Sequence, residues 1–235
     1  NAVSDQDMIS FENISFSIAG RTLVKNSTVS IPNGHKVGLV GRNGTGKTSL
    51  FRLIYGEVTL DNGNLKLNQN ARVGGVSQEA PGSSVTLINT VLAADQERTE
   101  LLQKAEIEKD PLKISEIQTR LTDIDAWSAE ARASTILNGL GFDKHKQNLA
   151  CSEFSGGWRM RVALAAVLFS KPELLLLDEP SNYLDLEGTI WLQSYISQYP
   201  STVIIISHDR ALLNSSVNSI LHLEDKELHL YTGNY

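Results

Sequence analysis

The sequence predicts an α/β fold in which a parallel sheet is joined to an N-terminal antiparallel part and to a helical part. Short apolar runs alternate with helical patterns through the second half of the chain, as the strands and helices of a parallel sheet do. Apolar and polar residues alternate over residues 14–18, which is the period of a half-buried strand. Between Gly82 and Gly139 the chain has no glycine and places apolar residues at helical spacing. These three patterns predict the three parts of the fold.

The N-terminal elements are predicted to be strands and a first helix. A break at Ala19-Gly20 follows the alternating residues 14–18, and a second extended stretch then predicts an antiparallel hairpin. A short apolar strand leads into a glycine-rich loop, and a helix is expected to open from that loop. The expected elements are strands over 14–18 and 22–31, a turn at Pro32-Asn33-Gly34, a strand over 37–40, a helix over 49–55, turns at Gly63 and Gly74-Gly75, and a short strand near 72–77.

The glycine-free region is predicted to be a helical subdomain that contains a hairpin. Helical spacing is clear over 87–92 and over 114–124, and Pro111 fits the first turn of the second helix. Between Asp95 and Asp125, nine acidic and five basic residues give a net charge of −4, which is typical of a solvated helical face. Beyond this region we expect a helix over 158–169, a buried strand over 174–177, a helix over 186–197 and a second buried strand over 203–206.

Composition limits the class of protein. With 41% hydrophobic and 20% charged residues in a chain of 235, the sequence is that of a globular protein. The single cysteine, Cys151, excludes an internal disulfide framework and fits a reducing compartment. No apolar run approaches the roughly 18 residues of a membrane span, and the polar, acidic start is unlike a signal peptide, with Met8 a candidate first native residue. We therefore expect a cytoplasmic protein without a transmembrane segment, and the net charge of −6 argues against DNA as a partner.

The segment GRNGTGKT, residues 41–48, fills every fixed position of the phosphate-binding loop pattern. Its glycines let backbone N–H groups wrap around phosphate oxygens, and the positive end of the following helix adds to the attraction. Lys47 is expected to reach the β- and γ-phosphates, and the Thr48 hydroxyl to bind Mg²⁺. The candidate nucleotide-binding residues are Gly41, Arg42, Asn43, Gly44, Thr45, Gly46, Lys47, Thr48 and Ser49. The motif predicts a nucleotide without defining the reaction.

A second motif, LLLLDEP over residues 174–180, places two carboxylates at the end of a buried strand. Open α/β sheets bind ligands at the carboxyl ends of their strands. Asp178 is expected to hold the Mg²⁺ shell, and Glu179 to act as general base toward the water that attacks the γ-phosphate. Because Asp-Glu pairs are common in loops, this pair indicates a site only in combination with the phosphate-binding loop.

Three further features follow in an informative order, although each has an ordinary structural alternative. Residues 154–158, FSGGW, open a helix with a serine and two glycines and could form a second anion site, or Ser155 could simply cap the helix. His208 follows the last buried strand and could act at the site or be a satisfied polar histidine. Gln78 follows the strand near Val76 and could touch Mg²⁺ or the attacking water, or could be a turn residue.

In this order the motifs resemble the nucleotide-binding domain of ATP-binding-cassette (ABC) proteins over essentially the whole chain. SNYLD at 181–185 and YTGNY at 231–235 resemble the ABC-F branch, and residues 125–142 with the following FSGGWRMR look most like its bacterial YheS-type group. The signature departs from the common pattern in Trp158, which replaces glutamine, and in Tyr183, which replaces histidine. Neither change removes a group that performs the chemistry.

The resemblance implies a P-loop NTPase fold with a RecA-like core, an N-terminal antiparallel β-subdomain and a helical subdomain, all in one cassette. Such a cassette is the first of two, its partner lying in the same parent chain or in a second copy of this fragment, and its cofactors are ATP and Mg²⁺. The adenine-stacking position falls near Ile18, with Phe16 on the same strand face. The implied boundaries are 8–235 for the cassette, 8–36 for the antiparallel part, 37–80 with 171–235 for the core, and 81–170 for the helical part, with arm helices over about 87–125.

The resemblance also implies roles for the site residues. Glu179, His208 and Gln78 are the expected catalytic residues. Thr48, Gln78 and Asp178 are the expected metal ligands, and residues 41–49 bind ATP. Ser155, Gly156 and Gly157 would complete a nucleotide site on the opposing cassette, and Asp185 would bridge the interface between the cassettes.

The function implied is a Mg²⁺-dependent ATPase that needs a second cassette and couples ATP-driven closure to ribosome binding, near tRNA, in translation. Lys104, Lys109 and Lys113 are candidate contacts of the arm, although its negative charge argues against gripping RNA phosphates. The alternative is the ATPase subunit of an ABC membrane transporter. A DNA-repair or chromosome ATPase is disfavoured because no long coiled coil is inserted.

Overall fold

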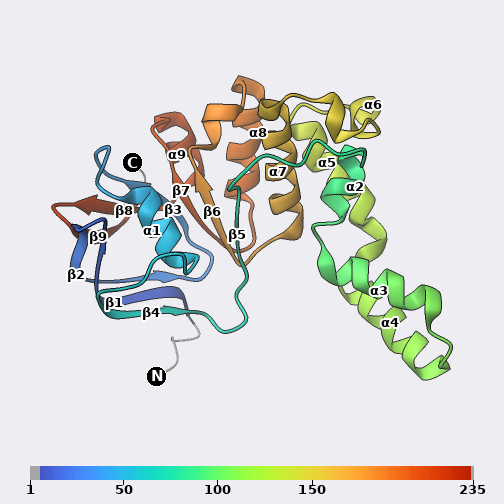
Figure 1. Cartoon of the computed structure of the whole chain (residues 1–235), viewed down its shortest axis with the longest axis horizontal. Helices are drawn as coiled ribbons and strands as arrows, with labels where there is room; N and C mark the ends of the chain where they lie inside the picture. Colours follow the sequence, from blue (N-terminus) through green and yellow to red (C-terminus); the bar gives the residue numbers. More distant parts are fainter. Residues whose placement is uncertain (1–5, 234–235) are drawn as a thin grey trace. The chain divides into compact units, whose positions relative to one another are not determined.

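The computed structural model describes residues 6–233, which divide into two compact units (Figure 1). The first unit contains the chain up to Gly75 and again from Pro172 onward, and the second unit contains Val76–Lys171. The last two residues of the YTGNY segment lie outside the described residues. Among residues 6–233, no helix combines the length and the apolar character needed to cross a membrane.

A three-stranded antiparallel sheet begins the first unit. Its order is β2-β1-β4, and the predicted hairpin between its first two strands is confirmed, with Ala19 and Gly20 both at positive φ in the turn. The third strand, β4, was not predicted, because Gly63 reads as a turn in the sequence. In the structure, β1 bulges opposite this glycine, and a Cβ on Gly63 would collide with the carbonyl oxygen of Asn13. The strands are β1 (Asp7–Ile18), β2 (Arg21–Pro32) and β4 (Asn62–Leu67).

A six-stranded sheet forms the core of the first unit in the order β5-β6-β7-β3-β8-β9. All pairs are parallel except β8 with β9, which confirms the parallel α/β core. Gly74 and Gly75 lie within β5 and not in a turn, since Gly75 packs against the carbonyl oxygen of Leu176. The strands are β3 (Lys36–Val40), β5 (Val73–Gly75), β6 (Leu174–Asp178), β7 (Thr202–Ile206), β8 (Ser219–Glu224) and β9 (Glu227–Thr232).

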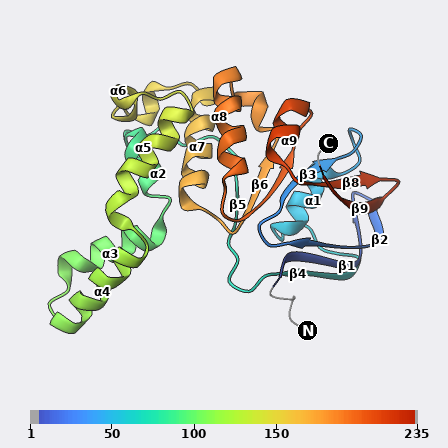
Figure 2. The same cartoon turned by 180° about the vertical axis from the view of Figure 1, so that it is seen from behind.

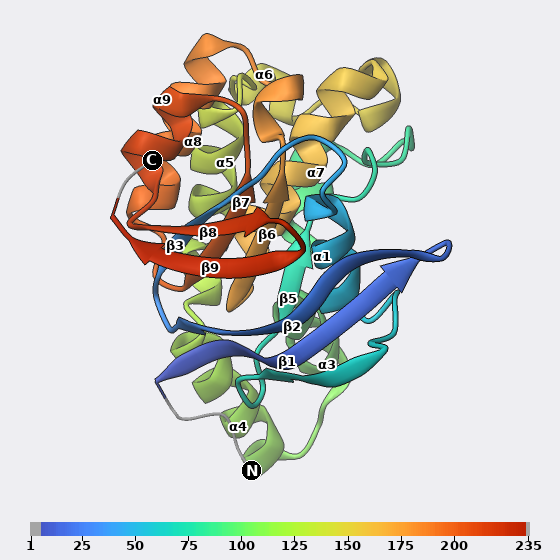
Figure 3. The same ribbon diagram turned by 90° about the vertical axis from the view of Figure 1, so that its left-hand side faces the viewer.

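The last antiparallel pair, β8 and β9, was not predicted from the sequence. Figure 3 shows β9 beside β2 of the three-stranded sheet, and the N–H of Leu228 donates to Ser27 Oγ at 3.1 Å there. The two sheets of this unit are thus linked at their edges.

The helices of the first unit cover the two faces of the six-stranded sheet. One apolar cluster joins Leu50 and Phe51 of α1 to β1 and β2 and to Val37 and Leu39 of β3. The opposite face of β3 packs against α9, since a Cβ on Gly38 would lie 3.1 Å from the side chain of Leu213. Figure 2 shows α8 and α9 side by side. The elements are α1 (Lys47–Ile54), the 3-10 helix η3 (Pro180–Tyr183), α8 (Leu186–Ser197) and α9 (Arg210–Ser216).

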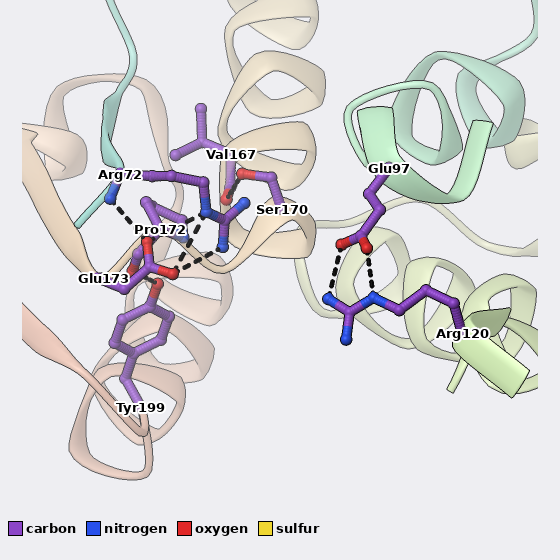
Figure 4. Close-up of polar contacts among 8 residues, drawn as sticks. All are labelled: Arg72, Glu97, Arg120, Val167, Ser170, Pro172, Glu173 and Tyr199. Atoms are coloured by element: carbon purple, nitrogen blue, oxygen red, sulfur yellow. Dashed lines mark hydrogen bonds and ion pairs between the residues drawn. The ribbon is translucent and has the colours of Figure 1, made fainter. Parts of the chain in front are cut away.

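The second unit is helical, and it contains the predicted hairpin. Helices α3 and α4 pack on each other, Pro111 is the first residue of α4, and Arg120 forms an ion pair with Glu97 across the hairpin (Figure 4). Ile107 and Leu112 are 77% and 68% exposed near the turn of the hairpin. The elements are α2 (Leu87–Leu92), α3 (Gln96–Ile107), α4 (Pro111–Asp123), η1 (Ala126–Ser128), α5 (Ala129–Gly139), α6 (Lys144–Gln147), η2 (Cys151–Glu153) and α7 (Gly156–Ser170).

Candidate nucleotide-binding site

The phosphate-binding loop connects β3 to α1, and its shape depends on glycine. Gly44 and Gly46 have φ values of 78° and 107°, a region that side chains disfavour. A Cβ on Gly41 would lie 2.6 Å from the carbonyl oxygen of Leu223, so that position leaves no room for one. The Thr45 hydroxyl donates to the carbonyl oxygen of Arg42 at 2.7 Å and closes the loop on itself. The three glycines of the loop are therefore each required by the backbone.

The start of α1 is suited to an anion. Gly46 occupies its N-cap position without a side-chain cap, and the first turn has no acidic residue. The first-turn N–H groups are therefore not satisfied by a capping side chain and can donate to phosphate oxygens. Lys47 is buried, and its Nζ donates to the carbonyl oxygens of Gly41 and Arg42. Its ammonium group lies in the curve of the loop, where phosphate oxygens can replace these two acceptors.

Thr48 and Asp178, the two expected metal ligands of the first unit, are in contact. The Thr48 hydroxyl donates to Asp178 Oδ2 at 2.8 Å, joining the start of α1 to the end of β6. A hydroxyl and one carboxylate fit Mg²⁺, which keeps several waters and phosphate oxygens as ligands. No cluster of three or more His, Cys, Asp or Glu side chains able to hold a metal occurs in residues 6–233.

The field around Asp178 is negative. Burial, with a smaller contribution from the carboxylates of Glu57 and Asp178, raises the pKa of Tyr55 to about 12. Burial also raises the pKa of Tyr183, and Asp178 adds to that effect. A cation beside Asp178 is therefore electrostatically favoured.

Glu179 and His208 form the second contact pair of the site. His208 Nε2 lies 3.2 Å from Glu179 Oε1, and the backbone N–H of His208 donates to Glu179 Oε2 at 3.3 Å. The Glu179 side chain is 21% exposed. Its backbone has φ 50°, and its N–H donates to the carbonyl oxygen of Ile206 at 2.8 Å. A left-handed conformation costs a non-glycine residue about 1–2 kcal/mol, so the carboxylate is held in place by a strained turn.

These groups surround one cavity of about 510 Å³ in the first unit. Phe16, on the face expected to stack adenine, is fully buried in the core and does not line this cavity. Ile18 does line it, together with Arg21 and Leu23, which sequence reasoning did not find because β2 contributes them from a separate segment. The lining residues are Ile18, Arg21, Leu23, Asn43, Gly44, Gly46, Lys47, Thr48, Ser49, Asp178, Glu179, Ile206 and His208.

Of the three remaining phosphate-loop residues, Gly41 and Arg42 line a neighbouring cavity of about 730 Å³ that shares Lys47 and His208 with the first, and Thr45 lines neither cavity. Asp185 is the N-cap of α8, where its Oδ1 accepts from the N–H of Gly188 at 2.8 Å. This hydrogen bond gives Asp185 a structural role as a helix cap, and its expected role at the interface between two cassettes stays a prediction.

The other site residues belong to the second unit. Ser155 occupies the N-cap position of α7, but its side chain makes no capping hydrogen bond, so the simple capping role is not realised. Gly156 and Gly157 form the first turn of this helix. Gln78 lies in the loop that follows β5, next to Glu79, which forms an ion pair with Arg159 of α7 at 3.1 Å. This ion pair was missed because its two residues are 80 positions apart, and the sequence does not show that they meet.

A family model described as "ABC transporter" matches residues 24–182, a span that contains the phosphate-binding loop, the Ser155–Gly157 turn, Asp178 and Glu179. The chain belongs to this family. As an ABC protein, it carries the ATP-binding cassette that its motifs predicted.

The relatives place the cassette in the ABC-F branch. It is 42% identical to "Probable ATP-binding protein YheS" of Haemophilus influenzae, over 97% of this chain and 36% of that protein. It is 40% identical to "ABC transporter F family member 3" of Arabidopsis thaliana, over 97% and 34%. It is 39% identical to human "ATP-binding cassette sub-family F member 3", over 97% and 33%. The cassette thus spans about a third of the length of these relatives.

Solved structures agree on the fold. "Structure of ATP binding subunit of ABC transporter" matches with a TM-score of 0.72 over 96% of this chain and 90% of that one, at 15% identity. "Structure of cbiO1 from clostridium perfringens" matches with a TM-score of 0.64 over 97% of this chain and 89% of that one, at 22% identity. The expected ABC cassette fold is confirmed.

Proposed function

We propose that residues 8–235 form one cassette that binds Mg²⁺ and ATP and hydrolyses ATP at the 510 Å³ cavity. The observation that carries this proposal is that two contacts line one cavity: Thr48 with Asp178 at 2.8 Å, and Glu179 with His208 at 3.2 Å. The first contact supplies oxygen ligands for a cation. The second supplies a base and a group that orients it.

Each residue of the site then has a defined task. Thr48 and Asp178 would hold Mg²⁺, which neutralises phosphate charge when bound, and Gln78 would join them. The Lys47 ammonium and the N–H groups at the start of α1 would bind the phosphates. Glu179 would accept a proton from the attacking water, while His208 keeps its carboxylate in place.

Hydrolysis in this proposal requires a second cassette, from the same parent protein or from a second copy of this chain. The start of α7 offers N–H donors to a γ-phosphate bound by the opposing cassette. The Ser155 side chain does not cap these N–H groups, and a Cβ on Gly157 would meet no atom within 4 Å. Asp185 would contact the interface between the two. ATP would hold the cassettes together, and hydrolysis would release them.

We further propose that the closing motion serves ribosome binding in the cytoplasm, near tRNA, as the ABC-F relationship suggests. The α3–α4 hairpin supports this proposal, because exposed Ile107 and Leu112 near its turn are available to a partner. The net charge of −4 over residues 95–125 favours a contact with few phosphates.

The test is co-sedimentation of ribosomes with the parent protein, after Glu179→Gln and the equivalent change in its second cassette block turnover. We expect ATP-dependent co-sedimentation. The matched control carries Lys47→Ala and the equivalent change in the second cassette, and it should bind neither ATP nor ribosomes. If the first variant binds ATP and stays in the supernatant, the translation role is wrong, and an ABC transporter membrane domain becomes the partner to test.

A further inference from the structure

The Ser155–Gly157 turn lies between two aromatic residues that contact the same ring. Phe154 precedes the turn and Trp158 follows it, and both pack on Phe142 in the loop between α5 and α6. The ring centroids of Phe154 and Trp158 lie 5.5 Å and 5.4 Å from that of Phe142, with interplanar angles of 90° and 61°. Tilted aromatic pairs at this spacing stabilise a structure beyond the apolar area that they bury. Both ends of the turn are therefore held at one place in the second unit.

The loop that carries Phe142 is itself held firmly. Phe142 is fully buried, and its carbonyl oxygen accepts a hydrogen bond from Gln147 Nε2 of α6 at 2.9 Å. The same nitrogen donates to the carbonyl oxygen of Ser134 in α5 at 3.2 Å. Gly141 has φ 100°, and a Cβ there would lie 3.3 Å from the Trp158 ring. The indole ring thus packs directly on the backbone of a well-anchored loop.

Two cations also contact the Trp158 ring. The Arg161 guanidinium lies 4.2 Å from the ring centroid, and Lys146 Nζ lies 5.6 Å from it. Arg161 is buried, and its Nη1 donates to the carbonyl oxygen of Leu140, the C-cap of α5, at 3.1 Å. Because cation–π contacts strengthen when the cation is removed from water, Arg161 holds the indole ring and joins α7 to the end of α5.

Trp158 belongs to the turn through its backbone as well. The N–H groups of residues 156–158 precede the first helical hydrogen bond, which runs from the Arg159 N–H to the carbonyl oxygen of Ser155. In the proposed function, these N–H groups contact the γ-phosphate bound by the opposing cassette. Backbone donors stabilise a reacting phosphate most when they are already in position, because nothing then has to be ordered during the reaction.

We propose that Trp158 is a positioning residue, whose ring acts with that of Phe154 to hold the Ser155–Gly157 turn in shape before a second cassette closes on it. The proposal rests on the proposed function. Trp158 stands where the common signature has glutamine, which has no ring to pack on Phe142 or to receive the guanidinium of Arg161. The departure from the common pattern thus gives this turn a support that glutamine does not offer.

Single-turnover ATP cleavage by the parent protein carrying Glu179→Gln tests the proposal. Because that change blocks the cassette's own site, the remaining cleavage belongs to the site that the Ser155–Gly157 turn completes. Adding Trp158→Ala should slow this cleavage at saturating ATP by about 10- to 100-fold, as the displacement of a positioned group does. Trp158→Phe keeps a ring against Phe142 and should restore most of the rate. The matched control is Trp127→Ala, which removes a 65% exposed tryptophan of the second unit and should leave the rate unchanged.

Gly157→Asp tests the turn separately from its aromatic support. A Cβ on Gly157 would meet no atom within 4 Å, so this variant should fold. Its carboxylate would repel the γ-phosphate, and the remaining cleavage should be lost.

Amide hydrogen exchange shows whether the effect of Trp158→Ala is local. The Arg159 N–H, which bonds to the carbonyl oxygen of Ser155 at 2.9 Å, should exchange about tenfold faster in this variant, because the start of α7 opens more often. Exchange in β6 and β7 of the first unit should be unchanged.

Four results would overturn the positioning role. They are a Trp158→Ala rate close to that of the parent with Glu179→Gln alone, an equal loss in Trp127→Ala, a Trp158→Phe rate as low as that of Trp158→Ala, and faster exchange in β6 and β7. If Gly157→Asp leaves cleavage unchanged, or if no cleavage remains with Glu179→Gln, the turn does not complete the opposing site. That part of the proposed function is then wrong, and the positioning role is overturned with it.

Discussion

Replacing Glu179 with glutamine tests the chemistry of the site with little change to its shape. Glutamine has the same size and can still accept the bond from the backbone N–H of His208, and the bond from the Glu179 N–H to Ile206 involves only the backbone. The positive φ of 50° applies equally to both residues. Fold and binding should therefore survive a change that removes the base.

The magnitudes follow from the position of the carboxylate. Loss of a general base lowers the rate by about 100- to 10,000-fold, which corresponds to roughly 3–5 kcal/mol in the barrier. At a separation of about 4 Å beside water, removing one negative charge relieves about 1 kcal/mol of repulsion with a phosphate, so ATP should bind about fivefold more tightly. The melting temperature should shift by less than about 2 °C, since the glutamine amide keeps an oxygen for the His208 N–H and places its NH₂ group beside His208 Nε2, so neither contact loses its partner.

A single-turnover assay with protein in excess over labelled ATP measures even slow cleavage, and fluorescence titration gives the dissociation constant. The matched control is Glu187→Gln, an exposed carboxylate on α8 that should leave rate and affinity unchanged. A rate within tenfold of the wild type would falsify the role of Glu179. Loss of ATP binding would show instead that the carboxylate shapes the pocket.

Three other changes probe the loop, the base position and the sheet. Gly41→Ala should weaken ATP binding by about 100-fold in calorimetry, because its Cβ would lie 2.6 Å from Leu223 O and displace the loop; normal affinity would contradict the packing argument. Ile18→Tyr should tighten ATP binding by about fivefold or more through stacking, and an unchanged dissociation constant would place the base away from Ile18. Burial alone would raise the pKa of Glu173, but hydrogen bonds from Arg72 outweigh it and lower the pKa from 4.5 (Figure 4). The stabilisation from Glu173 is therefore present above about pH 4.5 and is lost as the pH falls through the lowered pKa. Urea unfolding should thus find Glu173→Gln less stable than wild type at pH 7 and equal to it near pH 3, and a gap independent of pH would refute the ion pair as its source.

The central strands of the parallel core, β3, β6 and β7, could be predicted because each is a short apolar run with its own boundaries. Residues 174–177 and 203–206 are buried on both faces, and composition alone identifies such strands. The strand β4 could not be found in this way. Gly63 is needed because the backbone of the bulge in β1 lies directly against it. The sequence of one strand does not show what lies opposite it.

The same contrast holds for the site. Lys47, Thr48, Asp178 and Glu179 lie in motifs whose spacing reflects a local chemical task, so one sequence is enough to find them. The Glu179 N–H donates to the carbonyl oxygen of Ile206. Because every residue type has a backbone carbonyl, this contact cannot be predicted from the sequence. The same is true of the cavity wall that β2 contributes and of the ion pair between Glu79 and Arg159. Both depend on contacts between residues distant in the chain, which only the folded structure shows.

The strand order explains why the chemical groups meet at all. β6, β7 and β3 are neighbours in the sheet, and Asp178, His208 and the phosphate-binding loop follow the carboxyl ends of these three strands. Parallel pairing brings those ends to one edge, while Glu179 must turn back toward β7 to reach His208. That turn requires the left-handed backbone at Glu179, which the apolar strands beneath it can sustain. The strained backbone is therefore that of the proposed general base, Glu179. Folds tolerate strain at residues whose exact position matters more than local stability.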